Sequence, residues 1–143
     1  MHNKTMVYVC RKEHFNAAHR LYNPAWTKEK NQEVFGICSN EYFHGHNFEL
    51  IVTVKGHPQP DTGCVIDLKV LSSIIKREVI DKLDHRNMNI EVDFLQGKIP
   101  SCEVVVIEIW KILAKALSDY PHVQLHKLQL FETNKNFVEY YGE

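Results

Sequence analysis

The chain has 143 residues and a formal net charge of -1, with 17 Lys and Arg against 18 Asp and Glu. This length suits one domain with a substantial hydrophobic core, so we expect a single domain over residues 1–143. The charged residues are scattered without a basic stripe, which argues against nucleic acid and against an anionic membrane surface as partners.

The four cysteines are dispersed along the chain without paired spacing: Cys10, Cys38, Cys64 and Cys102. The sequence has no apolar run long enough to span a bilayer, and its N-terminus lacks the apolar segment of a signal peptide. Reduced thiols are therefore expected rather than a disulfide framework. These features together indicate a cytoplasmic protein.

The first half of the chain predicts two strands separated by a loop. Residues 6–19 are rich in β-forming residues, and the run ends in an apolar alternation that reaches His19. The polar, proline-containing stretch 23–33 predicts a long loop. From His44 onward alternate positions are apolar, so this second strand should bury one face against the core.

The second half predicts two helices followed by two strands. Asp67 is a suitable N-cap for a first helix that carries apolar residues at helical spacing. Ser101 can cap a second helix with a wide apolar face. The last strands are expected at residues 124–133 and 137–141, joined by a short Asn-Lys-Asn turn.

The predicted element order is β-β-α-α-β-β, which defines an α+β fold. Two helices can cover only one face of a four-stranded antiparallel sheet. The other face and the sheet edges then need burial, and closure of the sheet into a barrel across subunits would provide it. We therefore expect a homo-oligomer.

Three histidines form the strongest chemical motif. His44 and His46 flank Gly45, and residues two apart on a strand point to the same side, about 6.6 Å apart. His19, at the end of the first strand, is the candidate third ligand. Catalytic zinc sites use three protein ligands and leave one position to water or substrate, whereas structural sites close with four. This set therefore predicts a catalytic Zn²⁺ site at one end of the core.

Cys38 lies six residues before His44. A thiol near a metal and a cationic imidazole ionises more readily, and the thiolate can act as a base or nucleophile. A small buried hydrophobic residue explains Cys38 equally well.

Two further polar features carry possible chemistry. Asp84 and His85 directly follow the first predicted helix, and a carboxylate that orients an imidazole makes a general acid or base. Adjacent residues rarely hydrogen-bond each other in this way, so a polar helix end is at least as good an explanation. Glu132 shares the parity of the apolar positions of the third strand, and a heterocycle with two adjacent N–H donors would pair with its carboxylate. An ordinary strand-end glutamate explains its position somewhat better.

Taken together, seven segments resemble the 6-pyruvoyl-tetrahydropterin synthase family, which includes the 6-carboxytetrahydropterin synthases. They follow one another over nearly the whole chain: FNAAHRL (15–21), FGIC (35–38), HGHN (44–47), LDHRN (83–87), SCE (101–103), ET (132–133) and YGE (141–143). The resemblance implies the tunnelling fold, in which β-β-α-α-β-β subunits associate into a barrel, typically a homohexamer of two trimers.

The resemblance also implies a zinc-dependent lyase that converts 7,8-dihydroneopterin triphosphate to 6-pyruvoyl-tetrahydropterin or 6-carboxytetrahydropterin, in pockets between subunits. It assigns zinc to His19, His44 and His46, proton transfer to Cys38, Asp84 and His85, and binding of the pterin ring to Glu132, Ser101 and Cys102. The triphosphate has only candidate partners, which are Arg20, Lys28 and Lys135.

The chain departs from the family pattern in ways that leave the reaction branch open. The spacing from Cys38 to His44 is similar to that of animal 6-pyruvoyl enzymes. Glu41, three residues before His44, resembles a folate-pathway subgroup in which a glutamate replaces or accompanies the cysteine and 6-hydroxymethyl-7,8-dihydropterin is released. Cys102 stands where Thr or Ser is common.

Two non-catalytic hypotheses complete the set. The chain could be a zinc-containing pterin-binding domain, although such a domain would need only Glu132 and the pocket. A purely structural zinc module is the weakest hypothesis, because no fourth ligand is evident in the sequence.

Overall fold

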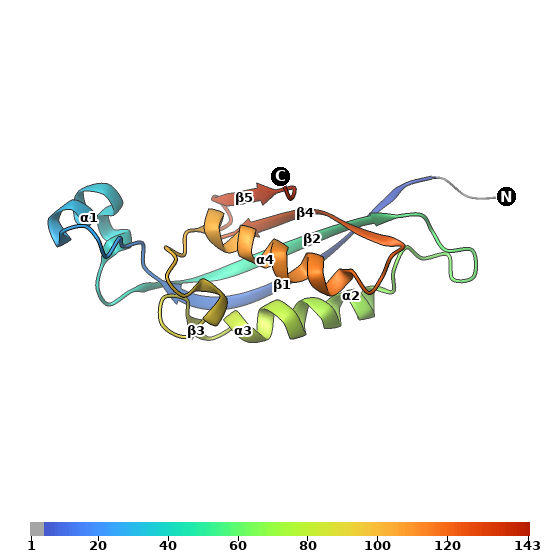
Figure 1. Cartoon of the computed structure of the whole chain (residues 1–143), viewed down its shortest axis with the longest axis horizontal. Coiled ribbons are helices and arrows are strands. Elements are labelled where there is room, and N and C mark those ends of the chain that lie inside the picture. The colour runs from blue at the N-terminus through green and yellow to red at the C-terminus, as the bar shows by residue number, and fades with distance from the viewer. Residues whose placement is uncertain (1–4) are drawn as a thin grey trace.

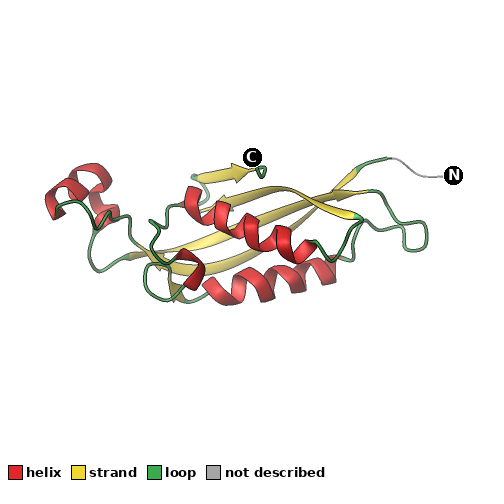
Figure 2. Cartoon of the chain, in the orientation of Figure 1, coloured by secondary structure: helices red, strands yellow, loops and turns green. Residues whose placement is uncertain are grey.

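The computed structural model describes residues 5–143, so the first four residues of the expected domain lie outside it. One five-stranded sheet carries the long helices on a single face (Figures 1 and 2), which confirms the α+β class. The strands are β1 (Val7–His19), β2 (His44–Gly56), β3 (Arg86–Asn87), β4 (Val123–Phe131) and β5 (Phe137–Tyr140). The helices are α1 (Lys28–Phe35), α2 (Leu68–Ile75), α3 (Asp81–Leu83) and α4 (Cys102–Leu117). A π-helical segment, Lys76–Ile80, joins α2 to α3, and 3₁₀ turns span Gly36–Ser39 and Asp93–Leu95.

The strand order in the sheet is β3-β1-β2-β4-β5. β1 and β2 pair antiparallel along their whole length, with His19 opposite His44 at one end. β2 pairs with β4, and β4 with β5, in the same antiparallel sense. β3 pairs in parallel with β1, so the sheet is mixed and the prediction of an antiparallel sheet was wrong at this edge. β3 has only two residues, too few for an alternating pattern to be visible in the sequence.

The core lies between the sheet and the two long helices. Alternate side chains of the strands point to this side, and Phe15 stacks on Phe48 with ring centroids 5.0 Å apart. Fully buried members of the core include Leu50, Leu71, Ile75, Leu83, Ile109, Leu113, Leu128 and Leu130. Each such side chain stabilises the fold by about 1.5–3 kcal/mol relative to an exposed one.

Side-chain caps set the start of both predicted helices. Asp67 accepts a hydrogen bond from the backbone N–H of Lys69, at 2.8 Å, before α2. Ser101 accepts one from Val104, at 3.2 Å, before α4. Both capping predictions are confirmed, since each oxygen satisfies a donor that the first turn leaves without a helical partner.

The stretch 23–33 is not the continuous loop that the sequence predicts. Helix α1 begins inside it, capped by Thr27, and projects from one end of the sheet (Figure 1). This helix carries little apolar surface, so no periodic pattern marks it in the sequence. Asn31 is fully buried and holds the turn before the helix, because its Oδ1 accepts a hydrogen bond from the backbone N–H of Asn23 at 2.7 Å.

A buried carboxylate joins β1 to α2. Glu13 Oε1 accepts hydrogen bonds from Ser72 Oγ and from Arg11 Nε, both at 2.7 Å. Burial alone would raise the pKa of Glu13. The hydrogen bonds from Ser72 and Arg11, with the charge of Arg11, outweigh burial and hold that pKa below its ordinary value.

We expect Glu13→Gln to lower the free energy of unfolding by about 1–3 kcal/mol at pH 7, because the charged acceptor of two hydrogen bonds is lost. A carboxylate with a lowered folded pKa stabilises the protein above its unfolded pKa and loses that contribution as the pH falls through the folded value. The difference between wild type and variant should therefore shrink below about pH 4. Urea denaturation at pH 7 and below about pH 4 measures this difference, with the exposed Glu33→Gln as control. An equal difference at both pH values would contradict this role.

Candidate metal centre

The pairing of β1 with β2 brings the three predicted ligands together. His19 lies opposite His44, and His46 lies two residues further along β2, opposite Ala17. All three side chains therefore point to the same face, at the end of the apolar layer. The ring centroids are 4.7 Å apart for His19 and His44, 5.0 Å for His44 and His46, and 5.3 Å for His19 and His46.

Glu132, directly after β4, completes this cluster. One ligand atom from each of the four residues lies within 4.8 Å of all the others. Glu132 Oε1 is 2.7 Å from His46 Nε2 and 3.7 Å from His19 Nε2. Glu132 alternates with the apolar residues of its strand, and this pattern predicted the face of the sheet on which it lies. Its proximity to the histidines depends on the pairing of β2 with β4, which the sequence did not reveal.

The imidazole nitrogens of the cluster are available to bind a metal. His19 Nδ1 lies 2.7 Å from the carbonyl oxygen of Pro100, to which it can donate, so Nε2 is left with a free lone pair facing the cluster. The Nε2 atoms of His19 and His46 are both buried and make no hydrogen bond, even though a Glu132 oxygen lies close to the second. Buried polar atoms without partners are uncommon, and a bound cation would satisfy both.

Burial favours the neutral form of His19 and His44. It lowers the pKa of His19, and the neighbouring imidazoles lower it further, against the opposing effects of Pro100 and Glu132. Burial and the charge of His46 likewise lower the pKa of His44. A neutral imidazole is the form that binds a metal. Nitrogen donors with one carboxylate suit zinc, so the residues fit the predicted cofactor.

The cluster opens onto a cavity of about 590 Å³. His46, Glu132 and the turn after β4 line it, together with polar residues of β1 and β2. Glu132 keeps 26% of its side chain exposed. This volume is within the range of small-molecule sites, so a ligand of that size can reach the cluster.

The N-terminus of α4 is the third element of the centre. Cys102, its first residue, is buried, and its Sγ donates a hydrogen bond to Glu132 Oε2 at 3.4 Å. Ser101 precedes it as the helix cap. The structure thus brings Cys102 to the predicted ring-binding carboxylate, while the Ser101 hydroxyl caps the helix.

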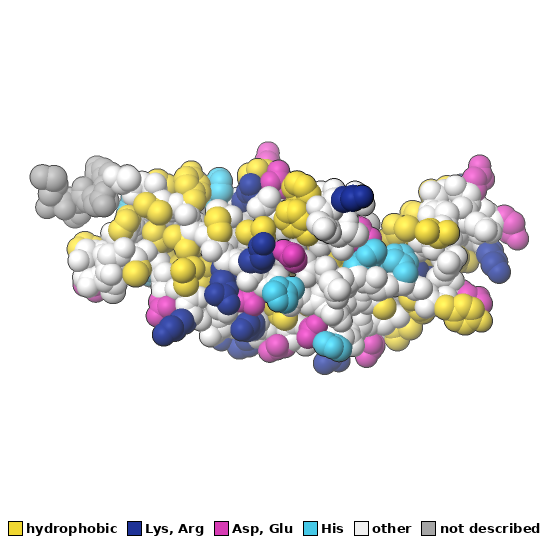
Figure 3. Space-filling view, turned by 180° about the vertical axis from the view of Figure 1, so that it is seen from behind, with side chains coloured by type: hydrophobic (Ala, Val, Ile, Leu, Met, Phe, Trp, Pro, Cys, Tyr) yellow, Lys and Arg dark blue, Asp and Glu magenta, His cyan; other side chains and the backbone are white. Residues whose placement is uncertain are grey.

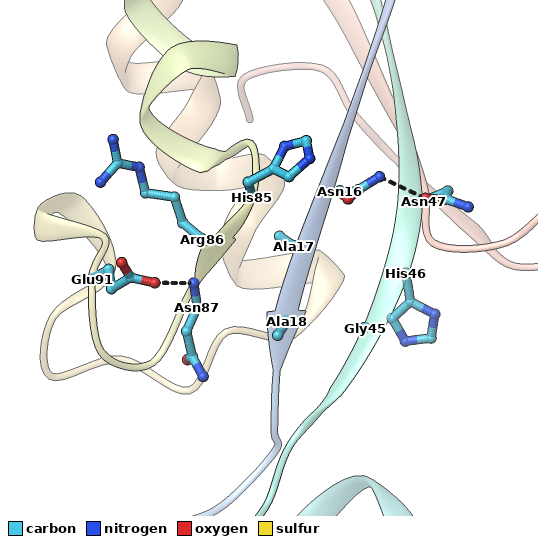
Figure 4. Close-up of a pocket in the computed structure, with 10 residues that line it drawn as sticks. All are labelled: Asn16, Ala17, Ala18, Gly45, His46, Asn47, His85, Arg86, Asn87 and Glu91. Atoms are coloured by element: carbon cyan, nitrogen blue, oxygen red, sulfur yellow. Dashed lines mark hydrogen bonds between the residues drawn. The ribbon is translucent and has the colours of Figure 1, made fainter.

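Asp84 and His85 do not join the cluster within residues 5–143. His85 lies beside β1 and the His46 ring beside β2, with both strands between them (Figure 4). The two residues do contact each other, since His85 Nδ1 is 3.0 Å from Asp84 Oδ2. Adjacent residues rarely pair in this way, and here they do so next to a backbone with a left-handed φ of 62° at His85.

Asp84 is held against the sheet edge. Its Oδ1 accepts a hydrogen bond from the backbone N–H of Asn16 at 2.9 Å, and this bond is the main reason that the pKa of Asp84 lies below its ordinary value. His85 N–H in turn donates to the carbonyl of Asn16 at 2.7 Å. His85 itself is largely exposed, with 79% of its side chain accessible. The pair therefore presents an oriented imidazole to the exterior of this chain.

Cys38 and Glu41 lie on the segment that connects α1 to β2. The backbone carbonyl of Cys38 accepts a hydrogen bond from Leu21 N–H at 2.7 Å, which ties the segment to the end of β1. Glu41 lines a separate cavity of about 460 Å³ together with Arg20 and Lys28. Neither Cys38 nor Glu41 belongs to the metal cluster in the described part of the chain.

The predicted cationic residues are divided between two places. The Arg20 guanidinium lies 3.9 Å from the ring centroid of Tyr22 and shares the 460 Å³ cavity with Lys28. Lys135 is exposed in the turn between β4 and β5.

In residues 5–143 no helix is both long and apolar enough to cross a membrane.

The fold and the site together define an α+β protein with a three-histidine centre at the end of its sheet. A family model described as 6-pyruvoyl tetrahydropterin synthase matches residues 8–143. The chain belongs to this family, as its sequence motifs predicted.

Individual relatives agree with this assignment. A protein of Pongo abelii named 6-pyruvoyl tetrahydrobiopterin synthase is 38% identical over 135 residues, which cover 94% of this chain and 91% of the relative. The solved structure of Caenorhabditis elegans 6-pyruvoyl tetrahydropterin synthase superposes with a TM-score of 0.91 at 34% identity and covers 100% of both chains. A Pyrococcus furiosus protein named dihydroneopterin monophosphate aldolase is 31% identical over 87% of this chain and 89% of its own length.

After treatment with a chelator, the protein should rebind about one Zn²⁺ per chain, and His46→Ala should weaken that binding more than about 100-fold. Because the pKa values of His19 and His44 are lowered, these two ligands should be protonated at a lower pH than a free imidazole, and affinity should decline as they gain protons. Competition with a chromophoric chelator measures both effects. His126→Ala is the matched control, since that ring stacks against Tyr8 and is no part of the cluster. Unchanged affinity in His46→Ala would remove His46 from the centre.

Proposed function

We propose that the protein is a zinc-dependent lyase that acts on 7,8-dihydroneopterin triphosphate and forms 6-pyruvoyl-tetrahydropterin, with 6-carboxytetrahydropterin as the close alternative. The observation that carries the proposal is the convergence of His19, His44, His46 and Glu132 in a member of this family. The Cys38-to-His44 spacing and the similarity to 6-pyruvoyl relatives favour the pyruvoyl product.

The three histidines would hold zinc. When bound, zinc would polarise the side-chain hydroxyls of the substrate and acidify the neighbouring carbon. Glu132 offers a fourth candidate ligand atom, so the lack of a fourth ligand no longer argues against a structural zinc module. Its partial exposure and the cavity beside it still favour a site that a ligand can enter.

Glu132 would anchor the pterin ring. A carboxylate can accept two parallel N–H bonds from the 2-amino group and the adjacent ring nitrogen of a pterin. Ser101 and Cys102 would form the wall beside it, at the N-terminus of α4. Arg20 and Lys28 would bind the triphosphate from the neighbouring cavity, while Lys135 is separated from them in this chain.

Proton transfer would be divided between two segments. The Cys38 thiolate would remove a proton from the substrate side chain, and His85, oriented by Asp84, would act as the partner acid and base. Triphosphate then leaves by elimination. No external oxidant or reductant is needed, because the ring gains the hydrogen that the side chain loses.

The position of His85 supports a site shared between subunits. Asp84 and His85 are not part of the metal cluster of their own chain, although His85 and His46 line one cavity of about 470 Å³ (Figure 4), and a neighbouring copy would deliver its pair to this centre.

The face without long helices carries exposed hydrophobic side chains among charged ones (Figure 3). Strand alternation places the exposed Tyr8 and Phe137 on this face, opposite to the buried Phe15 and Leu130. We propose a homohexamer of two trimers in which the sheets close into a barrel, and a cytoplasmic location in keeping with four free thiols.

Two alternatives keep the same centre. Glu41 as the base would favour carbon–carbon cleavage and release 6-hydroxymethyl-7,8-dihydropterin, and the similarity to a relative named as an aldolase supports that branch. A non-catalytic zinc-containing pterin-binding domain would need neither Cys38 nor His85.

Zinc-loaded protein incubated with 7,8-dihydroneopterin triphosphate should release triphosphate, and mass spectrometry of the pterin distinguishes the pyruvoyl, carboxy and hydroxymethyl products. We expect Cys38→Ala to reduce turnover at least about 100-fold, as loss of a general base does, while zinc and pterin still bind. Glu41→Ala is the matched variant from the same segment and should retain activity. The reverse pattern would select the aldolase branch, and no turnover by zinc-loaded wild type would leave only the binding domain.

Mixed oligomers test the shared site. His44→Ala and His85→Ala should each be inactive alone, whereas refolding them together should restore about a quarter of wild-type activity if subunits mix at random. The matched control mixes His44→Ala with His46→Ala, which damages the same centre in every chain and should restore nothing. Absence of recovery in the first mixture would place His85 in the site of its own chain or outside the site altogether.

A further inference from the structure

The two oxygens of Glu132 face different neighbours. Oε1 points toward the imidazoles, 2.7 Å from His46 Nε2, whereas Oε2 accepts the hydrogen bond from Cys102 Sγ at 3.4 Å. The hydrogen bond to Oε2 restrains the rotation of the carboxylate plane, while Oε1 faces the imidazoles without a hydrogen bond. A carboxylate that pairs with two parallel N–H donors depends on that rotation for both bonds.

Cys102 is placed rigidly enough to set this orientation. It is the first residue of α4, whose start is fixed by the Ser101 cap, and its side chain is 7% exposed within the core. Its thiol donates to Oε2, so the start of the helix and the carboxylate are joined by this contact.

We propose that Cys102 is a positioning residue that orients the Glu132 carboxylate for recognition of a 2-amino-4-oxo-pteridine ring. This inference rests on the proposed function, because it concerns the ring-binding half of the same site. Cys102 acts through Glu132, not by contact with the reacting carbons of the substrate.

The chemistry of a thiol suits this role. S–H is a weak donor, and a carboxylate oxygen has two lone pairs, so Oε2 can accept the thiol proton and still accept a ligand N–H. A hydroxyl at the same position would also donate. An alanine would leave Oε2 without its protein donor and release the rotation of the carboxylate.

The test compares two ring ligands that differ at one position. Pterin carries the 2-amino group, whereas lumazine carries an oxygen there, which would face the carboxylate with a lone pair instead of a donor. We expect wild type to prefer pterin, and the ratio of the two dissociation constants to measure how well Glu132 is aimed. Fluorescence titration of the zinc-loaded protein gives both constants, with the zinc content of each variant determined alongside.

We expect Cys102→Ala to reduce the preference for pterin about tenfold, through weaker pterin binding, with lumazine affinity changed less than about twofold. Cys102→Ser should keep the preference within about threefold of wild type, because the hydroxyl restores the donor. Glu132→Gln should abolish the preference whichever residue occupies position 102. Cys64→Ala is the matched control, since that thiol is exposed and lies in a different cavity.

An equal loss of affinity for both ligands in Cys102→Ala would show a packing role and overturn the inference. An unchanged preference in Cys102→Ala, or a loss in Cys102→Ser as large as in Cys102→Ala, would overturn it as well. If wild type binds neither ring, the proposed pterin site itself is wrong. If wild type prefers pterin and Cys102→Ala keeps that preference, the pterin site stands and only the role of Cys102 is wrong.

Discussion

The antiparallel register of β1 on β2 is the constraint on which the rest of this structure depends. It places His19 opposite His44, and the strand period of two then turns His46 to the same face. A shift of one residue would send one strand's histidines to the opposite face of the sheet. The apolar side chains that follow along both strands hold this register, because the same shift would expose Phe15 or Phe48. Core packing and the metal centre are thus specified by one pairing.

Charge and burial act together at the centre. Burial lowers the pKa values of His19 and His44, which favours their neutral form, while Glu132 supplies the only carboxylate of the cluster in the described chain. The Pro100 carbonyl and the Cys102 thiol support this arrangement from the segment that leads into α4. One short stretch before and at the start of that helix therefore orients both an imidazole and a carboxylate.

The location of Asp84 and His85 is the structural basis of the proposed association. A positive φ at His85 and the hydrogen bonds to Asn16 stabilise an oriented, exposed pair at the sheet edge. Although His85 is exposed and oriented by Asp84, neither residue is part of the metal cluster of its own chain. The proposed homo-oligomer would bring this pair to another chain's centre and would also cover the face that the helices leave open.

The sequence by itself determined the family, the α+β class, both long helices with their caps and the three histidines, because strand alternation, helix caps and motif spacing are local patterns. It could not reveal β3, which is too short to show a period, or α1, whose surface is polar. Only the tertiary structure decided that Glu132 and Cys102 meet at the histidines and that His85 does not. Those contacts depend on strand pairing and on the seating of α4, which bring together residues as far apart in sequence as His19 and Glu132.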